Sequence, residues 1–180
     1  MSRAIPFTPS QDIEARRRSV GPVIAGVLTQ ELAEFCESGV SVTLGVSTIS
    51  GQPIAGLALA CRITSAGTMK IFLREPANVP LLAALAGGSA IAITFSEPRT
   101  HRSIQVKADR ARQVELEADD LALVARQVAF FESELVFISY TPRFAAYYCA
   151  YRDEEVVALE LSPRNAFVQT PGPGAGEQLG

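Results

Sequence analysis

The chain is poor in the residues that build metal centres and disulfide frameworks. Its 180 residues include no tryptophan, a single histidine (His101) and three cysteines, Cys36, Cys61 and Cys149. There is no CxxC pair, and one histidine cannot complete a ligand set with distant cysteines, so no metal site is expected. The odd number and wide spacing of the cysteines also argue against a disulfide framework. We expect three buried thiols in a reducing compartment.

Charge is also scarce. Charged residues make up 19% of the chain and the net charge is -3, which gives no overall attraction to nucleic acid or acidic membranes. The basic residues between Arg99 and Lys107 are few and lack the interleaved aromatic residues of a nucleic-acid surface. No apolar run has the length of a signal peptide or of an uncharged transmembrane helix. We therefore expect a cytoplasmic protein, and 180 residues suit one domain.

The usual constellations for hydrolysis are missing. A Ser-His-Asp triad would have to use His101, and the chain has no GxSxG motif. Asp119 and Asp120 could pair as catalytic carboxylates, but they stand where a helix is expected to begin, and helix capping explains them. The glycines at 172, 174 and 176 lack the GK[ST] ending of a phosphate loop. These residues therefore give little support to a hydrolase.

The pattern of apolar residues indicates a polar N-terminal arm (1–21), a central domain (22–162) and a tail rich in proline and glycine (163–180). Helical spacing predicts helices and alternation predicts strands. The stretch 136–151 fits either. The expected helices cover residues 11–18, 22–38, 77–86 and a longer segment from 119 or 120; the expected strands cover 40–49, 54–63, 69–74 and 156–161, with two more inside 89–116.

Most of these strands follow one another through tight turns. The segments Ser50-Gly51-Gln52-Pro53 and Ser65-Ala66-Gly67 have the residue types that such turns require. Consecutive hairpins predict an antiparallel sheet, in contrast to the parallel sheet of alternating strands and helices. The expected fold class is therefore mainly β with helices (α+β), with the sheet closed into a barrel and the helices outside it.

The segment Ser89–Leu116 holds the clearest candidate for a binding surface. Ile104 and Val106 alternate with Gln105 and Lys107, so the two pairs point to opposite faces of a strand. The polar face then carries an amide and an ammonium group. Three further polar or basic side chains come just before this strand: Arg99, His101 and Arg102. This group suits an anionic ligand, and a solvated outer face with a basic turn is the alternative.

Three stretches, in this order, resemble the pyridoxamine 5'-phosphate oxidase-like family of FMN-binding proteins. The family's opening strand pair is similar to GVSVTLGVSTISGQPIAGLALACRI, and its next strand, helix and strand are similar to MKIFLREPANVPLLAALAGGSAIAITF. A strand that reads Arg-Gln-Val-Arg in the oxidases is similar to HRSIQVKA. The resemblance implies a six-stranded antiparallel split β-barrel of the FMN-binding type. It also implies a homodimer with FMN in a groove at the subunit interface.

The resemblance also implies roles for individual residues. Gln105 matches the glutamine that contacts the flavin, and Lys107 stands in place of the arginine that follows. Arg62 lies at the end of the strand that lines the flavin in the family. Arg74 and Asn78 lie where the family has its phosphate ligands at a strand end and a helix start.

The chain departs from the oxidases at that helix start. Their Ser-Arg-Lys run is replaced by Glu75-Pro76-Ala77-Asn78-Val79, and their C-terminal tryptophan is absent. The missing phosphate charges would then come from Arg74, Arg99 or Arg102, and the helix N-terminus would still offer free N–H groups. His101 or Lys107 would polarise the edge of the flavin.

These observations lead to three hypotheses. The first is an FMN-dependent oxidoreductase, with an unknown substrate and no catalytic side chain assigned, because the cofactor carries the redox chemistry. The second is a non-catalytic split-barrel protein that binds FMN, haem or another anionic cofactor, with His101 or a tyrosine as the haem ligand. The third is a structural dimer that has lost its ligand.

Overall fold

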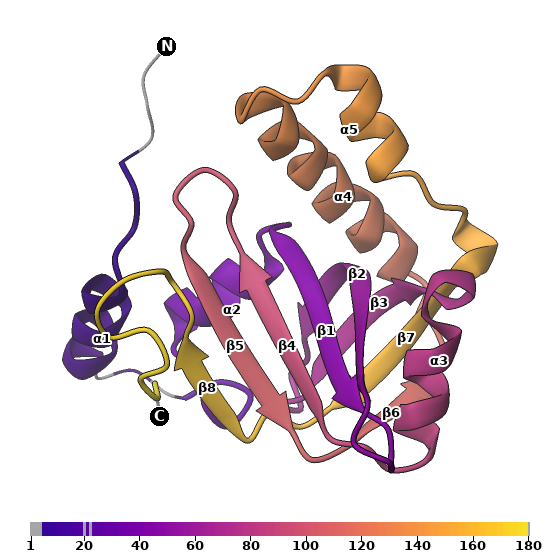
Figure 1. Ribbon diagram of the computed structural model, residues 1–180, viewed down its shortest axis with the longest axis horizontal. Coiled ribbons are helices and arrows are strands. Elements are labelled where there is room, and N and C mark those ends of the chain that lie inside the picture. The colour runs from indigo at the N-terminus through magenta and orange to yellow at the C-terminus, as the bar shows by residue number, and fades with distance from the viewer. Residues whose placement is uncertain (1–4, 20, 22, 180) are drawn as a thin grey trace.

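The computed structural model describes residues 5–19, 21 and 23–179, and it shows one curved antiparallel sheet with helices around it (Figure 1). The expected α+β class is confirmed. Within the described residues, the sheet has eight strands in the order β6-β7-β3-β2-β1-β4-β5-β8. The strands are β1 (Ser41–Ser47), β2 (Pro53–Ile63), β3 (Met69–Arg74), β4 (Ile91–Ser96), β5 (Ser103–Ala108), β6 (Ala111–Val114), β7 (Val156–Leu161) and β8 (Asn165–Val168).

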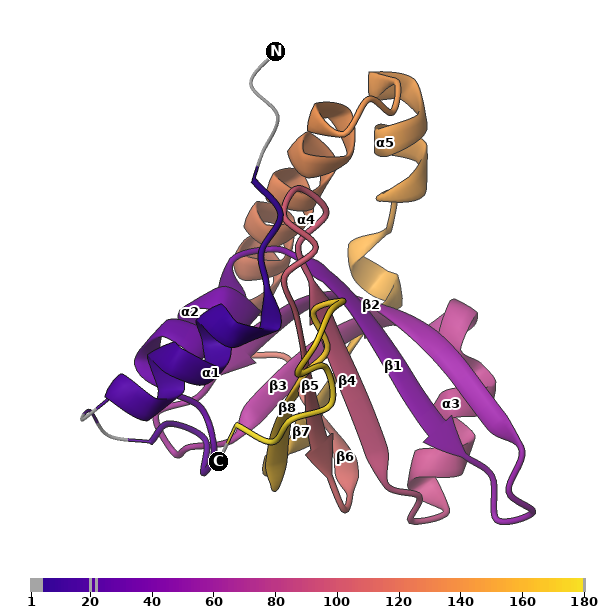
Figure 2. The ribbon, with the colours of Figure 1, turned by 60° about the vertical axis from the view of Figure 1, so that its left-hand side comes forward.

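A bend between two strands closes the sheet into a barrel. Only Asp109 and Arg110 separate β5 from β6, yet β5 pairs with β4 on one side of the sheet and β6 pairs with β7 at the opposite end. The sheet must therefore curl until these two parts meet, as Figure 2 shows. The expected count of six strands is wrong. The bend divides one long strand into β5 and β6, and β8 adds a strand beyond β5.

Alternate side chains of the strands fill the barrel. The strand register places Ile93 beside Leu44 and Val106, and it places Ile71 beside Leu159. Each of these five side chains is at most 1% exposed. Burying a side chain of this kind stabilises the fold by about 1.5–3 kcal/mol. Because side chains occupy the interior of so small a barrel, a ligand has to bind on its outside.

The helices pack around the barrel. They are α1 (Pro9–Arg18), α2 (Gln30–Glu37), α3 (Glu75–Ala86), α4 (Asp120–Phe137) and α5 (Pro142–Tyr148), with a 3-10 turn at Asp153–Glu155. Leu32 of α2 and Leu81 of α3 join the barrel core. Val124 of α4 packs on Ala60 and Phe72, which lie on the outer side of β2 and β3. α5 packs on α4, so it lies at the edge of the molecule (Figure 1).

The helix expected over residues 22–38 is shorter in the structure. It begins only after Thr29, whose hydroxyl oxygen accepts a hydrogen bond from the Leu32 N–H at 3.2 Å. Upstream, Ile24 and Leu28 pair with one another across a turn, and residue 22 lies outside the described residues. The end of the helix follows the expectation, because Gly39 adopts a φ of +87°. Residues 142–148, within the stretch left open between helix and strand, form α5.

The tail contains a strand that the sequence analysis did not predict. Its strand β8 pairs with β5, and the chain then turns back so that the Leu179 N–H donates to the Ala166 carbonyl at 2.7 Å. Leu179 is 2% exposed, and its carbonyl accepts a hydrogen bond from Arg16 Nε of α1 at 2.5 Å. The end of the described chain is therefore packed against the barrel and against α1. The division into arm, domain and tail stays a prediction.

Among the described residues, no helix has the length and apolar character needed to cross a membrane.

Candidate functional site

Among the described residues, no helix covers the outer side of the half of the sheet formed by β1, β4, β5 and β8. α4 lies on the outer side of β2, β3 and β7, whereas the outer side of β1, β4, β5 and β8 faces the viewer in Figure 1 with nothing packed in front of it. The side chains on this side are mostly small or polar. We call it the open face, and it consists of Thr43, Gly45, Ala55, Leu57, Ala92, Thr94, Gln105, Lys107, Asn165 and Phe167.

The floor of the open face is flat where small residues lie side by side. The register places Gly45 between Ala55 and Ala92, then continues from Ala92 to Lys107 and from Lys107 to Asn165. These five residues are among those that line an open hollow of about 680 Å³, which is within the range of small-molecule sites. The hollow extends past the end of the strands to Val46 and Ile91 of the barrel core. A glycine and two alanines leave space above the sheet for a planar group. A lysine stands at one end of this space.

Gln105 and Lys107 lie together on the open face, as the alternation predicted. The Gln105 Nε2 donates a hydrogen bond to the Thr94 hydroxyl at 3.2 Å. Lys107 is exposed, and its Nζ lies 4.7 Å from the centre of the Phe167 ring. No carboxylate pairs with Lys107 among the ion pairs of the described chain. Its ammonium is therefore available to an anionic ligand.

Arg74 reaches the edge of the same face. Its Nη1 donates to the Ala150 carbonyl at 3.0 Å, and the described residues provide it with no carboxylate partner. It lines a narrow crevice between the sheet and α5, together with Leu57 of the open face and Tyr148. Arg74 is thus the third predicted residue that the fold brings to this face.

Arg62 lies elsewhere and is already neutralised. Its guanidinium pairs with Asp119 and with the fully buried Asp120, each at 3.0 Å, at the start of α4. The hydrogen bond from Arg62 lowers the pKa of Asp119 below its usual value. Lys70 pairs with the same group, reaching Glu117 at 2.5 Å. These contacts fix α4 to the sheet and leave Arg62 little capacity for a phosphate.

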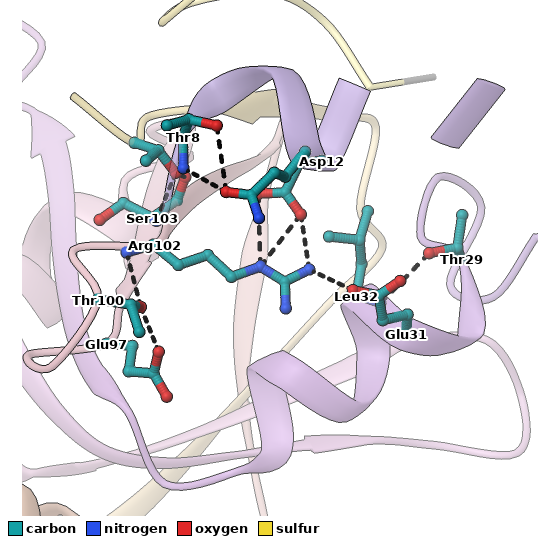
Figure 3. A network of polar contacts seen from close by, with 11 residues as sticks. Thr8, Asp12, Thr29, Glu31, Leu32, Glu97, Thr100, Arg102 and Ser103 are labelled. Atoms are coloured by element: carbon teal, nitrogen blue, oxygen red, sulfur yellow. Dashed lines mark hydrogen bonds and ion pairs between the residues drawn. The ribbon is translucent and has the colours of Figure 1, made fainter. Parts of the chain in front are cut away.

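Arg102 joins three elements near the N-terminal arm (Figure 3). Its Nη2 contacts Asp12 of α1 at 2.6 Å and Glu31 of α2 at 2.9 Å, and its guanidinium stacks on Phe7 and Phe35. Burial raises the pKa of Asp12 above its usual value, and the contacts with Arg102 only partly offset this effect. Arg102 therefore has a structural role, because it joins the β4–β5 hairpin to α1 and α2.

Arg99 has a similar role at the tip of the β4–β5 hairpin. Its Nη2 lies 2.6 Å from the buried Glu134 of α4, and its guanidinium lies 3.7 Å above the ring of Phe137. His101 occupies the same tip, where it is exposed and has a φ of +62°. Neither residue lies on the open face.

Asn78 points towards the sheet from α3. Its Nδ2 donates to the carbonyls of Leu57 at 3.2 Å and Arg74 at 2.8 Å, and the side chain is buried. It supports the junction of β2, β3 and α3 from inside. The structure therefore places Gln105 and Lys107 side by side on the open face and Arg74 at its far border, next to Asn78. It places Arg62, His101 and Arg102 apart from this face.

The sequence analysis missed the floor of the hollow and its far side. Gly45, Ala55 and Ala92 are inconspicuous in the sequence, although each occupies the outward position of an alternating strand. Asn165 comes from β8, inside the tail. Arg164 also lines the hollow, and its exposed guanidinium pairs with Asp109 at 2.7 Å.

One cluster of acidic groups in the described chain has the spacing of metal ligands: Glu117, Asp119 and Asp120. Arg62 and Lys70 already neutralise it, so its donor set fits a structural ion-pair network.

Comparison with known proteins gives likeness of structure only. Neither a family model nor a curated protein sequence matches the chain. Among solved structures, a candidate pyridoxamine 5'-phosphate oxidase from Lactobacillus delbrueckii is 13% identical, with a TM-score of 0.48 over 78% of this chain and 93% of that chain. HutZ, described as the haem storage protein of Vibrio cholerae, is 16% identical, with a TM-score of 0.45 over 79% of this chain and 94% of that chain.

Two further structures extend the comparison. An F420 reductase is 10% identical, with a TM-score of 0.47 over 77% of this chain and 98% of that chain. Another solved structure aligns over 96% of this chain and 92% of that chain, with a TM-score of 0.50 and 14% identity. The structural neighbours of this chain include split-barrel proteins of the pyridoxamine 5'-phosphate oxidase-like fold. At such identities the likeness concerns the fold alone, and there it agrees with the resemblance seen in the sequence.

Proposed function

We propose that this chain is an FMN-dependent oxidoreductase of the pyridoxamine 5'-phosphate oxidase-like type, and that it binds FMN on the open face as a homodimer. The observation that carries the proposal is the row from Ala55 through Gly45 and Ala92 to Lys107. It offers a flat floor for a ring system and an unpaired cation at one end of that floor. The substrate is not specified by these residues.

The residues of the hollow suit the two parts of FMN. The isoalloxazine ring is planar and largely apolar, so it suits the floor of glycine and alanine. The phosphate needs cations, and Lys107 and Arg164 both line the hollow. Arg164 is paired with Asp109, but both side chains are about two-thirds exposed, so this pair can exchange partners at little cost.

FMN would supply the redox chemistry, since it accepts and donates hydride. The chain's own residues would bind and orient it. Gln105 stands next to Lys107 on the same strand face, and its amide can donate to a polar edge of the ring once it leaves Thr94. Arg74 lies at the other border of the face and can receive the anionic group of a second ligand.

A second subunit is part of the proposal. The open face is shallow, and a cofactor lying on it would remain in contact with water on its outer side. A second copy of the chain packed against the open face would exclude that water, which strengthens the electrostatic contacts with the ligand.

A non-catalytic cofactor-binding protein is the second candidate. The observation in its favour is that Arg62, Arg99 and Arg102 are each neutralised by carboxylates. Few cations then remain for a phosphate, whereas haem carries its charge on two separate carboxylates, each of which needs only one cation or hydrogen-bond donor. His101 is exposed and has no side-chain partner in the described structure. If it is the axial ligand, His101→Ala should abolish the haem Soret shift, and an unchanged spectrum would exclude that role.

Titration of the full chain with FMN and with riboflavin tests the site. Lys107→Ala should weaken FMN binding by about tenfold or more, because a hydrogen bond to a charged group contributes about 1.5–3 kcal/mol. The same variant should bind riboflavin, which has no phosphate, as the unmodified chain does. Arg110→Ala is the matched control, because Arg110 is exposed but lines a different hollow.

A second variant addresses the floor. Ala92→Leu would place a branched side chain where the ring is proposed to lie, and it should weaken FMN and riboflavin equally. Unchanged FMN affinity in both Lys107→Ala and Ala92→Leu would show that the open face is not the site.

A further inference from the structure

α5 presents an unusual number of aromatic rings to solvent. The exposed fractions are 47% for Tyr140, 44% for Phe144, 85% for Tyr147 and 45% for Tyr148. With 100° between successive helical residues, the three rings on α5 fall within an arc of about 100°. Tyr140 precedes the helix and stacks on Phe144 with ring centres 4.8 Å apart. We call these four residues the aromatic surface.

The fold explains only part of this surface. Phe144 also stacks on Tyr148 with ring centres 5.9 Å apart, and the ring centres of Tyr148 and Phe131 of α4 lie 6.3 Å apart. The rings of Tyr140, Phe144 and Tyr148 therefore help to hold α5 in place. Tyr147 contributes little, because most of its ring is in water. An exposed aromatic beside three half-exposed ones is a common mark of an interaction surface.

The aromatic surface adjoins the open face. The crevice beside α5 is lined by Tyr148 from the aromatic surface and by Leu57 from the open face. Leu57 is 48% exposed, which is also unusual for a leucine in the middle of a strand. A partner that covers the open face at Leu57 therefore also meets Tyr148.

The area indicates that one partner covers both surfaces. A large aromatic side chain offers about 150–250 Å², so the four exposed fractions correspond to roughly 450 Å². A stable interface needs about 800 Å² from each partner, which the aromatic surface alone does not reach. A partner on the aromatic surface would therefore need a neighbouring surface as well, and the open face adjoins it at Leu57. Lys107 is the only charged side chain of the open face, and depletion of charge is typical of the centre of an interface.

We propose that the aromatic surface of α5 is part of the interface between two copies of this chain, continuous with the open face. The inference rests on the proposed function, because that proposal identifies the occupant of the open face as a second copy. It adds the residues that hold the two copies together outside the cofactor site. In a two-fold dimer the aromatic surfaces of both copies would be buried.

Sedimentation equilibrium of the full chain tests the interface. The unmodified protein should be a dimer at micromolar concentration, and Tyr147→Glu should raise the dimer dissociation constant by at least tenfold. Ala146→Glu is the matched control, because Ala146 is exposed on α5 about 100° away from Tyr147 and should leave the constant unchanged. Tyr147→Glu should fold normally, since little of its ring is packed.

A photo-crosslinking experiment gives an independent readout. Replacing Tyr147 with p-benzoylphenylalanine should yield a covalent species of twice the monomer mass on irradiation, and the same replacement at Ala146 should yield much less.

A dimer that Tyr147→Glu leaves intact, with no crosslink at 147, would overturn the α5 interface while leaving FMN binding on the open face untouched. A monomer at all concentrations would also overturn it, and would leave the surface for a different protein. Loss of FMN binding in Lys107→Ala with an intact dimer would concern the cofactor site only.

Discussion

Gly56 on β2 lies so close to Asn78 that a side chain has no room there. A Cβ at position 56 would stand 2.2 Å from Asn78 Oδ1 and 2.8 Å from Leu81 Cδ1. We expect Gly56→Ala to lower the free energy of unfolding by about 1–3 kcal/mol, as overpacking of a core commonly does. Urea denaturation would measure this loss.

A double-mutant cycle checks the cause. Asn78→Ala removes the closest atom, so Gly56→Ala should cost clearly less in that background than in the unmodified chain. Additive losses would show that Asn78 is not the residue that requires glycine at position 56.

Glu134 should make stability depend on pH in an unusual direction. Burial raises its pKa above the usual value for glutamate, and Arg99 only partly offsets this. The folded state therefore holds the proton more tightly than the unfolded chain. The contribution of Glu134 to stability is fully present below its unfolded pKa and declines as the pH rises through the folded pKa.

The comparison with Glu134→Gln isolates this effect. Glutamine stays neutral, so the stability of the unmodified chain relative to the variant should fall as the pH rises from about 4 to about 7. Urea unfolding across that range measures the difference. A difference that stays constant, or that grows with pH, would contradict the account.

Local sequence predicted where some candidate site residues lie and not where others lie, for a physical reason. Gln105 and Lys107 could be assigned to one face because alternation within a strand is a local property. Whether Arg62 and Arg102 are free to bind a ligand depends on ion-pair partners that are remote in the chain. Arg62 meets Asp119 across 57 positions and Arg102 meets Asp12 across 90 positions. Nothing in the neighbouring residues shows that these guanidinium groups are already paired.

The same contrast holds for the strands and helices. β3 (Met69–Arg74) and β7 (Val156–Leu161) have the expected bounds, because each is a short, mostly apolar segment with polar residues on both sides. β8 was not predicted, because its four residues lie among proline and glycine and depend on pairing with β5. The helix over 22–38 was predicted too long, because the turn at Ile24–Leu28 also has apolar residues at helical spacing.

β8 should therefore be necessary for stability, although the proline and glycine content of the tail predicts a loop. A chain that ends at residue 163 loses the buried Ala166, Val168 and Leu179 and exposes the edge of β5. We expect unfolding to become easier by at least about 3 kcal/mol, and the shortened chain to aggregate through the free edge. Thermal unfolding and light scattering would show this.

An exposed position in the same tail provides the control. Pro173→Ala alters the loop beyond β8 without touching these buried side chains, so it should change stability little. If the chain ending at 163 were as stable as the full chain, β8 would be only loosely attached.

The molecule as a whole is a filled barrel with two exposed surfaces to which we assign a role, the open face and the aromatic surface. The interior is packed with side chains, so both the proposed cofactor and the proposed partner have to use the outside. The open face supplies a flat floor with one free lysine, and the neighbouring aromatic surface supplies apolar area. The two proposals thus give a role to the open face and a role to the aromatic surface.

The visible spectrum of the purified protein, followed by titration of the stripped chain with FMN, tests the central claim most directly. The account predicts a flavin spectrum, or saturable FMN binding that quenches flavin fluorescence and is weakened by Lys107→Ala. A colourless protein that does not bind FMN at any concentration tested would contradict it, and haem would then be titrated against the chain and against His101→Ala.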